Sequence, residues 1–173
     1  LAAYPIEIEF PDIGPYRSGN TGVDFTHHFD SGRPGPTVMI NALTHGNEVS
    51  GAIALAALLD SGIRPRRGSL TLSFANVEAY ARFDSARPDA SRFVDEDFNR
   101  VWSEAKLDSD AESSELRRAR ALRPFVDNAD FLLDLHSMHE KSAPLMVCGP
   151  LDKGIAFALQ IGTPVHIISD AGH

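Results

Sequence analysis

The chain has 173 residues, of which 43% are hydrophobic and 23% charged, and its formal net charge is −8. This composition is typical of a folded globular domain with a substantial core and excludes a disordered segment. An acidic chain lacks the concentrated basic face of a nucleic-acid-binding protein, and no apolar run approaches the roughly 20 residues that span a bilayer. We therefore expect neither a nucleic-acid partner nor a membrane-spanning segment.

The single cysteine, Cys148, can form no disulfide within the chain. Disulfides persist mainly in oxidising compartments, so this cysteine usage fits a reducing one, and we expect a cytoplasmic protein. No signal peptide is visible, although the chain begins with Leu1 and not with methionine. The sequence does not indicate an oligomeric state.

The first part of the chain predicts short strands separated by turns. Residues 6–10 alternate apolar and acidic side chains, which predicts an edge strand, and residues 23–29 predict a second strand. Residues 11–15 and 31–36 are rich in glycine and proline and predict turns.

A β-α-β unit follows. Residues 37–43 are mostly apolar, as expected of a central strand that is covered on both faces. Residues 47–59 are apolar nearly all round and predict a buried crossover helix, which Ser61 and Gly62 end. Residues 69–77 predict the next strand. Such a unit implies parallel pairing and a right-handed crossover.

The second half of the chain continues the alternation of strands and helices. Residues 78–101 predict a long irregular excursion, and the capping-box spacing of Ser109 and Glu112 predicts the start of a helix that Pro124 interrupts. The remaining predicted elements are strands at 131–135, 144–148 and 165–169 and a helix at 151–161. The pattern predicts one α/β domain over residues 1–173, with helices on both faces of the sheet.

Three residues form a candidate metal site. Two histidines and one glutamate, here His45, Glu48 and His136, are the ligand set of a catalytic zinc ion with an open fourth position. Both histidines follow predicted strands, and ligands bind at the carboxyl ends of strands in open α/β sheets. Taken singly, His45 with Glu48 also fits a surface pair, and His136 a hydrogen-bonded core histidine. Their combination favours one zinc ion per chain.

Two carboxylates are candidates for supporting these ligands. Asp134 shares a strand face with His136 and can orient it, as carboxylates beside metal ligands do, although an ordinary strand-end acceptor fits equally well. Asp97 is placed in the same supporting role. His139 is close enough to contact His136, but a solvent-exposed position is the simpler expectation.

Residues 91–100 are a second cluster of polar side chains. Arg92, Asn99 and Arg100 offer many hydrogen-bond donors, and two arginines beside a metal suit a substrate that carries a carboxylate. The alternative is a salt-bridged loop in which the acidic residues 95–97 pair with these arginines. Composition alone favours that alternative.

Three motifs, in this order and spacing, resemble the succinylglutamate desuccinylase/aspartoacylase family, a branch of the zinc carboxypeptidase-like hydrolases. They are His45-Gly46-Asn47-Glu48, then Arg92 with Asp97-Phe98-Asn99-Arg100, then Asp134-Leu135-His136. The resemblance runs from about residue 37 to the end of the chain, and the family pattern has leucine in place of Phe98. It implies a central mixed, largely parallel sheet between helices.

The resemblance also implies a function. It implies zinc on the two histidines and the glutamate, Arg92 polarising the scissile carbonyl group, and Asn99 with Arg100 holding the substrate carboxylate. The expected reaction is zinc-dependent hydrolysis of an amide in a small anionic substrate such as an N-acyl amino acid. A zinc carboxypeptidase acting on peptide C-termini and a non-catalytic, metal-dependent carboxylate-binding module remain alternatives.

One feature of the family pattern has no counterpart in this chain. Members of the family carry a catalytic glutamate on a later strand, whereas Glu140 is the only glutamate after His136 and lies too close to it. We therefore expect the general base downstream of residue 173, in a longer protein of which this chain is the N-terminal portion.

Overall fold

The computed structural model describes residues 8–138 and 141–171. The chain, for which the length suggested one domain, forms two compact units, Leu1–Ser137 and Met138–His173, and each is described by itself. Among the described residues, no helix is both long enough and apolar enough to cross a membrane.

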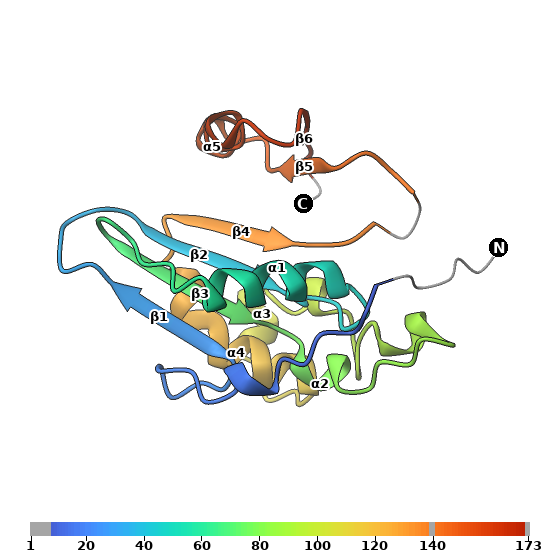
Figure 1. Ribbon diagram of the computed structural model, residues 1–173. Coiled ribbons are helices and arrows are strands. Elements are labelled where there is room, and N and C mark those ends of the chain that lie inside the picture. The colour runs from blue at the N-terminus through green and yellow to red at the C-terminus, as the bar shows by residue number, and fades with distance from the viewer. Residues whose placement is uncertain (1–7, 139–140, 172–173) are drawn as a thin grey trace. The chain divides into compact units, whose positions relative to one another are not determined.

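A four-stranded sheet is the centre of the larger unit (Figure 1), with the strand order β1-β3-β2-β4. Strand β1 (Thr26–Asp30) pairs antiparallel with β3 (Ser69–Phe74). Strand β2 (Thr37–Ala42) pairs parallel with both β3 and β4 (Phe131–Leu135). The sheet is therefore mixed and largely parallel, which confirms the predicted fold class.

Helix α1 (Val49–Asp60) connects β2 to β3 and confirms the predicted β-α-β unit. It packs on one face of the sheet, where its buried side chains meet the inward-facing residues of the strands. Gly51 allows this close approach, because a Cβ atom there would lie 2.8 Å from the carbonyl oxygen of Leu135. The core on this face is apolar; its buried members are Ile13, Ala42, Leu43, Val49, Ala52, Leu55, Leu70, Leu72, Phe74 and Tyr80.

A second core lies around helix α4 (Ser114–Asp127), which Figure 1 shows behind the sheet when α1 is in front. The short helices α3 (Glu104–Leu107) and η3 (Phe98–Arg100) pack against α4. The buried residues of this core are Ala75, Phe98, Val101, Leu107, Leu116, Ala119 and Leu122. The larger unit thus has helices on both faces of its sheet.

The start of α4 was predicted wrongly. The cap is Ser113, whose hydroxyl accepts from the backbone N–H of Leu116 at 3.0 Å, and not the Ser109 to Glu112 box. Ser109 instead donates its hydroxyl to the carbonyl of Lys106 at the end of α3. The guanidinium of Arg120 then binds the carbonyls of Ser109 and Ala111, which holds this segment outside the helix.

The N-terminal strand prediction also fails over the part that is described. Residues 8–10 form no strand, and the Phe10 ring stacks on Tyr80 with a centroid distance of 4.2 Å, while Ile6 and Glu7 lie outside the described residues. A 3-10 turn, η1 (Gly14–Tyr16), follows. Aromatic packing of this segment replaces strand pairing.

Two predicted strands are shorter than expected. The strand predicted at 23–29 begins only at Thr26, because Phe25 has a positive φ of 59°. The strand predicted at 69–77 ends at Phe74, since Asn76 caps the short helix α2 (Val77–Tyr80). The irregular excursion that follows holds a further 3-10 turn, η2 (Pro88–Ser91).

The smaller unit is a second β-α-β arrangement. Strands β5 (Leu145–Cys148) and β6 (His166–Ser169) pair in parallel, and helix α5 (Asp152–Ile161) connects them. Helix α5 ends at Gly162, which takes the left-handed conformation common at such ends, with φ 71°. All three elements lie within one residue of their predicted bounds.

Candidate metal centre

The turn between β2 and α1 places His45 and Glu48. Both are buried, with 2% and 7% of their surface exposed. Gly46 fits between two other segments, since a Cβ atom there would lie 2.5 Å from the backbone nitrogen of Tyr80, and its own N–H donates to the carbonyl of Arg92 at 3.0 Å. The turn is therefore clamped by backbone contacts on both sides.

The structure brings the three candidate ligands together. His45 Nδ1 donates to one oxygen of the Glu48 carboxylate at 2.7 Å, and His136 Nδ1 donates to the other at 2.8 Å. One ligand atom from each residue lies within 4.8 Å of the other two. The His136 side chain is 35% exposed, so one side of the cluster faces solvent. Two imidazoles and a carboxylate that converge in this way fit the donor set of a catalytic zinc ion.

A hydrogen-bond network behind His136 sets the direction of its ring. Its Nε2 donates to Asp134 Oδ2 at 2.8 Å, and the same carboxylate accepts from Thr44 Oγ1 at 2.7 Å and from Asn41 Nδ2 at 3.0 Å. Asn41 and Asp134 are register partners on β2 and β4. With Nε2 occupied by Asp134, the Nδ1 atom is directed at Glu48. Asp134 thus makes the contact expected of a supporting carboxylate.

The cluster is strongly coupled electrostatically. Burial alone would raise the pKa of Glu48, but hydrogen bonds from His136 and His45 outweigh it and lower that pKa to about 2. Burial alone would lower the pKa of His136, but Asp134 and Glu48 raise it to about 10. At neutral pH the metal-free cluster therefore holds a proton on His136 Nδ1, which a metal ion must displace.

Arg92 and Asp97 lie on the far side of His45. Arg92 Nη2 donates to His45 Nε2 at 3.0 Å and its Nη1 donates to Glu48 Oε1 at 3.3 Å. Asp97 Oδ1 lies 3.2 Å from His45 Nε2 and accepts from the backbone N–H of Asn99 at 2.9 Å. Burial alone would raise the pKa of Asp97, but the Asn99 N–H and His45 outweigh it and lower that pKa.

Asn99 and Arg100, the predicted carboxylate-binding pair, are exposed. Arg100 Nη1 donates to the carbonyl of Asn99 in its own turn, at 3.4 Å. Within the described part of the chain, neither side chain makes a hydrogen bond to the three candidate ligands, so their role in substrate binding stays a prediction. His139 and Glu140 lie outside the described residues.

Sequence reasoning missed Glu115, which is completely buried beneath the loop that carries Arg92 and Asp97. Its carboxylate accepts from the backbone N–H groups of residues 94–96 and from Asn76. An acidic residue in the first turn of a helix is common, because the positive end of the helix dipole stabilises its charge, and most such residues are exposed. No local signal therefore distinguishes the buried Glu115 from these.

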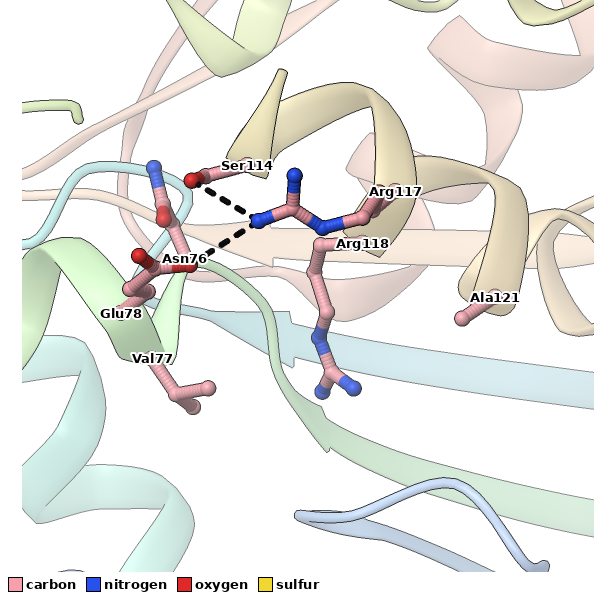
Figure 2. Close-up of a pocket in the computed structure, with 7 residues that line it drawn as sticks. All are labelled: Asn76, Val77, Glu78, Ser114, Arg117, Arg118 and Ala121. Carbon is pink, nitrogen blue, oxygen red and sulfur yellow. Dashed lines mark hydrogen bonds and ion pairs between the residues drawn. The ribbon is translucent and has the colours of Figure 1, made fainter. Parts of the chain in front are cut away.

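A pocket of about 240 Å³ between α2 and α4 is separate from the cluster (Figure 2). It is lined by Asn76, Val77, Glu78, Ser114, Arg117, Arg118 and Ala121. Arg117 Nη2 donates to Ser114 Oγ at 3.2 Å and lies 3.7 Å from Glu78 Oε2 (Figure 2). Arg118 donates to the carbonyls of Phe74 and Ala75, so both arginines are engaged in holding the fold.

The chain matches a known family and a curated relative. Residues 34–170 match the model of the succinylglutamate desuccinylase/aspartoacylase catalytic domain. Over 137 residues the chain is 31% identical to an N-acyl-aromatic-L-amino acid amidohydrolase (carboxylate-forming) of Xenopus laevis. The matched region covers 74% of this chain and 42% of that protein.

Solved structures show the same fold. An aspartoacylase family protein of Mesorhizobium loti is similar with a TM-score of 0.63 and 23% identity, over 83% of this chain and 46% of that one. Murine aminoacylase 3 is similar with a TM-score of 0.60 and 24% identity, over 79% of this chain and 48% of that one. The chain thus spans less than half the length of these relatives.

Proposed function

Because the chain belongs to the succinylglutamate desuccinylase/aspartoacylase family, we propose that it carries the metal site of a zinc-dependent hydrolase that cleaves the amide bond of N-acyl amino acids. The observation that supports this most is the convergence of His45, Glu48 and His136 at the carboxyl ends of two parallel strands. Ligands bind at this edge in open α/β sheets.

The three side chains fit a zinc ion by their chemistry. Each histidine offers Nδ1, and a carboxylate lies beside the other nitrogen of each ring to accept its N–H, Asp134 for His136 and Asp97 for His45. A bound zinc ion would lower the pKa of a coordinated water to about 7 and polarise a carbonyl group. The open side of His136 would leave room for substrate and water.

The remaining residues supply positioning and charge. Arg92 has an N–H donor within reach of both His45 and Glu48, and in the proposed reaction it stabilises the oxyanion that develops on the scissile carbonyl. Asn99 and Arg100 lie on the same segment, eight residues or fewer further along, and hold the substrate carboxylate, Arg100 through its guanidinium fork and Asn99 through its amide NH₂ group. No residue within the described part of the chain is assigned as the general base.

The relatives suggest the class of substrate. The Xenopus laevis protein is named for N-acyl aromatic L-amino acids, and the murine protein is an aminoacylase. We extend this to a small N-acyl amino acid with a free carboxylate.

The test measures zinc content and the release of free amino acid from a panel of N-acyl amino acids. His45→Ala and His136→Ala should lose bound zinc and at least about 100-fold in rate. His28→Ala is the matched control, because His28 lies on β1 at the opposite edge of the sheet from β4. Unchanged zinc in both ligand variants would overturn the metal assignment, and zinc binding without turnover by the whole protein would favour a binding module.

A further inference from the structure

Glu115 is a buried carboxylate that holds a loop. None of its surface is exposed, although it stands in the first turn of α4. Its Oε1 accepts from Val94 N at 2.7 Å and from Asn76 Nδ2 at 2.9 Å. Its Oε2 accepts from Asp95 N at 3.1 Å and from Glu96 N at 3.3 Å. Both oxygens are thus occupied by two donors each.

The three backbone groups that Glu115 binds lie between two residues of the candidate site. Arg92 precedes them and Asp97 follows them, and both approach His45 Nε2, at 3.0 Å and 3.2 Å. Residues 92–97 form no helix or strand. The position of Arg92 and Asp97 therefore depends on contacts outside the segment.

Other bonds join this segment to the start of α4, but they come from less buried groups. Asp95 Oδ2 accepts from Ser114 N at 2.7 Å, and Glu96 Oε1 accepts from Ser113 Oγ at 2.8 Å. A carboxylate is costly to bury unless hydrogen bonds compensate it, and Glu115 is compensated mainly by the peptide groups of this one segment. The buried charge of Glu115 therefore needs these N–H groups, and the loop needs the carboxylate to keep its path.

We propose that Glu115 is a positioning residue for the catalytic site: by clamping the peptide groups of residues 94–96, it sets where Arg92 and Asp97 lie against His45. It contacts neither of the two side chains and acts through the backbone between them. The inference rests on the proposed function for its kinetic test only.

Glu115→Gln tests the clamp with almost no change in volume. Whichever way the new carboxamide turns, its NH₂ group faces two N–H donors that the carboxylate accepted. We expect kcat/KM to fall about 10- to 100-fold, as misplacement of a positioned group does, with zinc content unchanged. Glu112→Gln, the same substitution at an exposed site just before α4, is the control and should change neither.

A double-mutant cycle with Arg92→Ala separates positioning from a general loss of structure. If Glu115 acts by placing Arg92, then Glu115→Gln should cost less than about 2-fold once Arg92 is absent, because coupled residues do not add. If Glu115→Gln lowers kcat/KM by the same factor in the Arg92→Ala variant as in the wild type, the proposal is overturned.

A spectroscopic measurement keeps the inference independent of turnover. The ¹⁵N signals of the His45 imidazole in the zinc-loaded protein report its contacts with Arg92 and Asp97. We expect these signals to shift in Glu115→Gln and not in Glu112→Gln, and unchanged signals would contradict the proposal. If the whole wild-type protein does not hydrolyse any N-acyl amino acid, the proposed function fails while this shift still decides the role of Glu115. Should Glu115→Gln not fold, Glu115→Asp, which keeps the charge on a shorter side chain, takes its place in the same measurements.

Discussion

Two regions meet at His45, and they are held in place by different means. The ligand side consists of His45 and Glu48, in the turn from β2 to α1, and of His136, directly after β4, so the pairing of β2 with β4 brings them to one edge of the sheet. The donor side is the segment 92–97, which has no regular structure and is tied to α4 by side chains, Glu115 above all. Substitutions on the ligand side should therefore affect metal binding, and those on the donor side should affect the reaction while metal binding persists.

The two regions touch at Gly46, and a side chain there should have the largest effect. Gly46→Ala would place a Cβ atom against the backbone of Ser91 and Tyr80, neither of which can move without shifting a whole segment. We expect a loss of about 3 kcal/mol in the free energy of unfolding, as is typical of overpacking in a core. Gly154→Ala in α5 is the control, because its nearest neighbour would be 3.6 Å away. Denaturant unfolding measures both, and equal stability of the two variants would show that the clamp on the turn is loose.

The ion pair between Glu48 and His136 should make the stability of the metal-free protein depend on pH. The pKa of Glu48 is lowered to about 2, so its contribution is present above its unfolded pKa and is lost as the pH falls below about 4 toward 2. The pKa of His136 is raised to about 10, so its contribution is present below about 6.5 and is lost as the pH rises toward 10. We expect a maximum at about pH 5–6 and a fall on either side, the alkaline fall being reduced because the His136 side chain is 35% exposed and solvent screens its charge.

Unfolding of the metal-free protein across this pH range provides the measurement. Glu48→Gln removes the charge from the centre of the cluster, so it should abolish the contribution of Glu48 to the acid flank and weaken the alkaline flank, which Asp134 still supports. Identical pH profiles for Glu48→Gln and the wild type would place the dependence on other groups.

Asp134 and Asp97 allow a direct comparison of the two sides. Asp134→Asn should weaken zinc binding by about 10- to 100-fold, because the carboxylate no longer orients His136 as an Nδ1 ligand. Asp97→Asn is the matched change on the donor side, next to the outer nitrogen of His45, and should weaken it less. Competition with a chelator gives both affinities. A larger loss of zinc affinity in Asp97→Asn than in Asp134→Asn would mean that the donor side contributes more to metal binding than the ligand side.

The smallest expected effect concerns Arg100, which is exposed. Arg100→Lys keeps the charge and loses the guanidinium fork, so binding of an anionic substrate or product should weaken about 10-fold. The comparison ligand is the neutral amide of the same compound, whose binding should not change. If the wild type binds the amide as tightly as the acid, Arg100 does not bind the carboxylate.

The parts of the fold that follow from local patterns were predicted well. The apolar runs of β2 and β4 and the mostly apolar helix α1 were placed within about two residues, because a run of apolar residues bounded by turn residues predicts such an element directly. The start of α4 was misplaced, since Ser109 and Ser113 both fit a cap. Arg120, eleven residues after the first of them, decides between the two by binding the Ser109 carbonyl.

By itself, the sequence determined the elements of the sheet and the family, and it pointed to His45, Glu48 and His136 as a set. Periodicity and short motifs record these features over a few neighbouring residues. The tertiary structure decided which nitrogen of His136 faces Glu48, how Arg92 and Asp97 share His45, and that Glu115 is buried beneath their loop. These contacts join groups that lie far apart in the sequence and come together only when the sheet and α4 have packed. No local sequence pattern therefore predicts them.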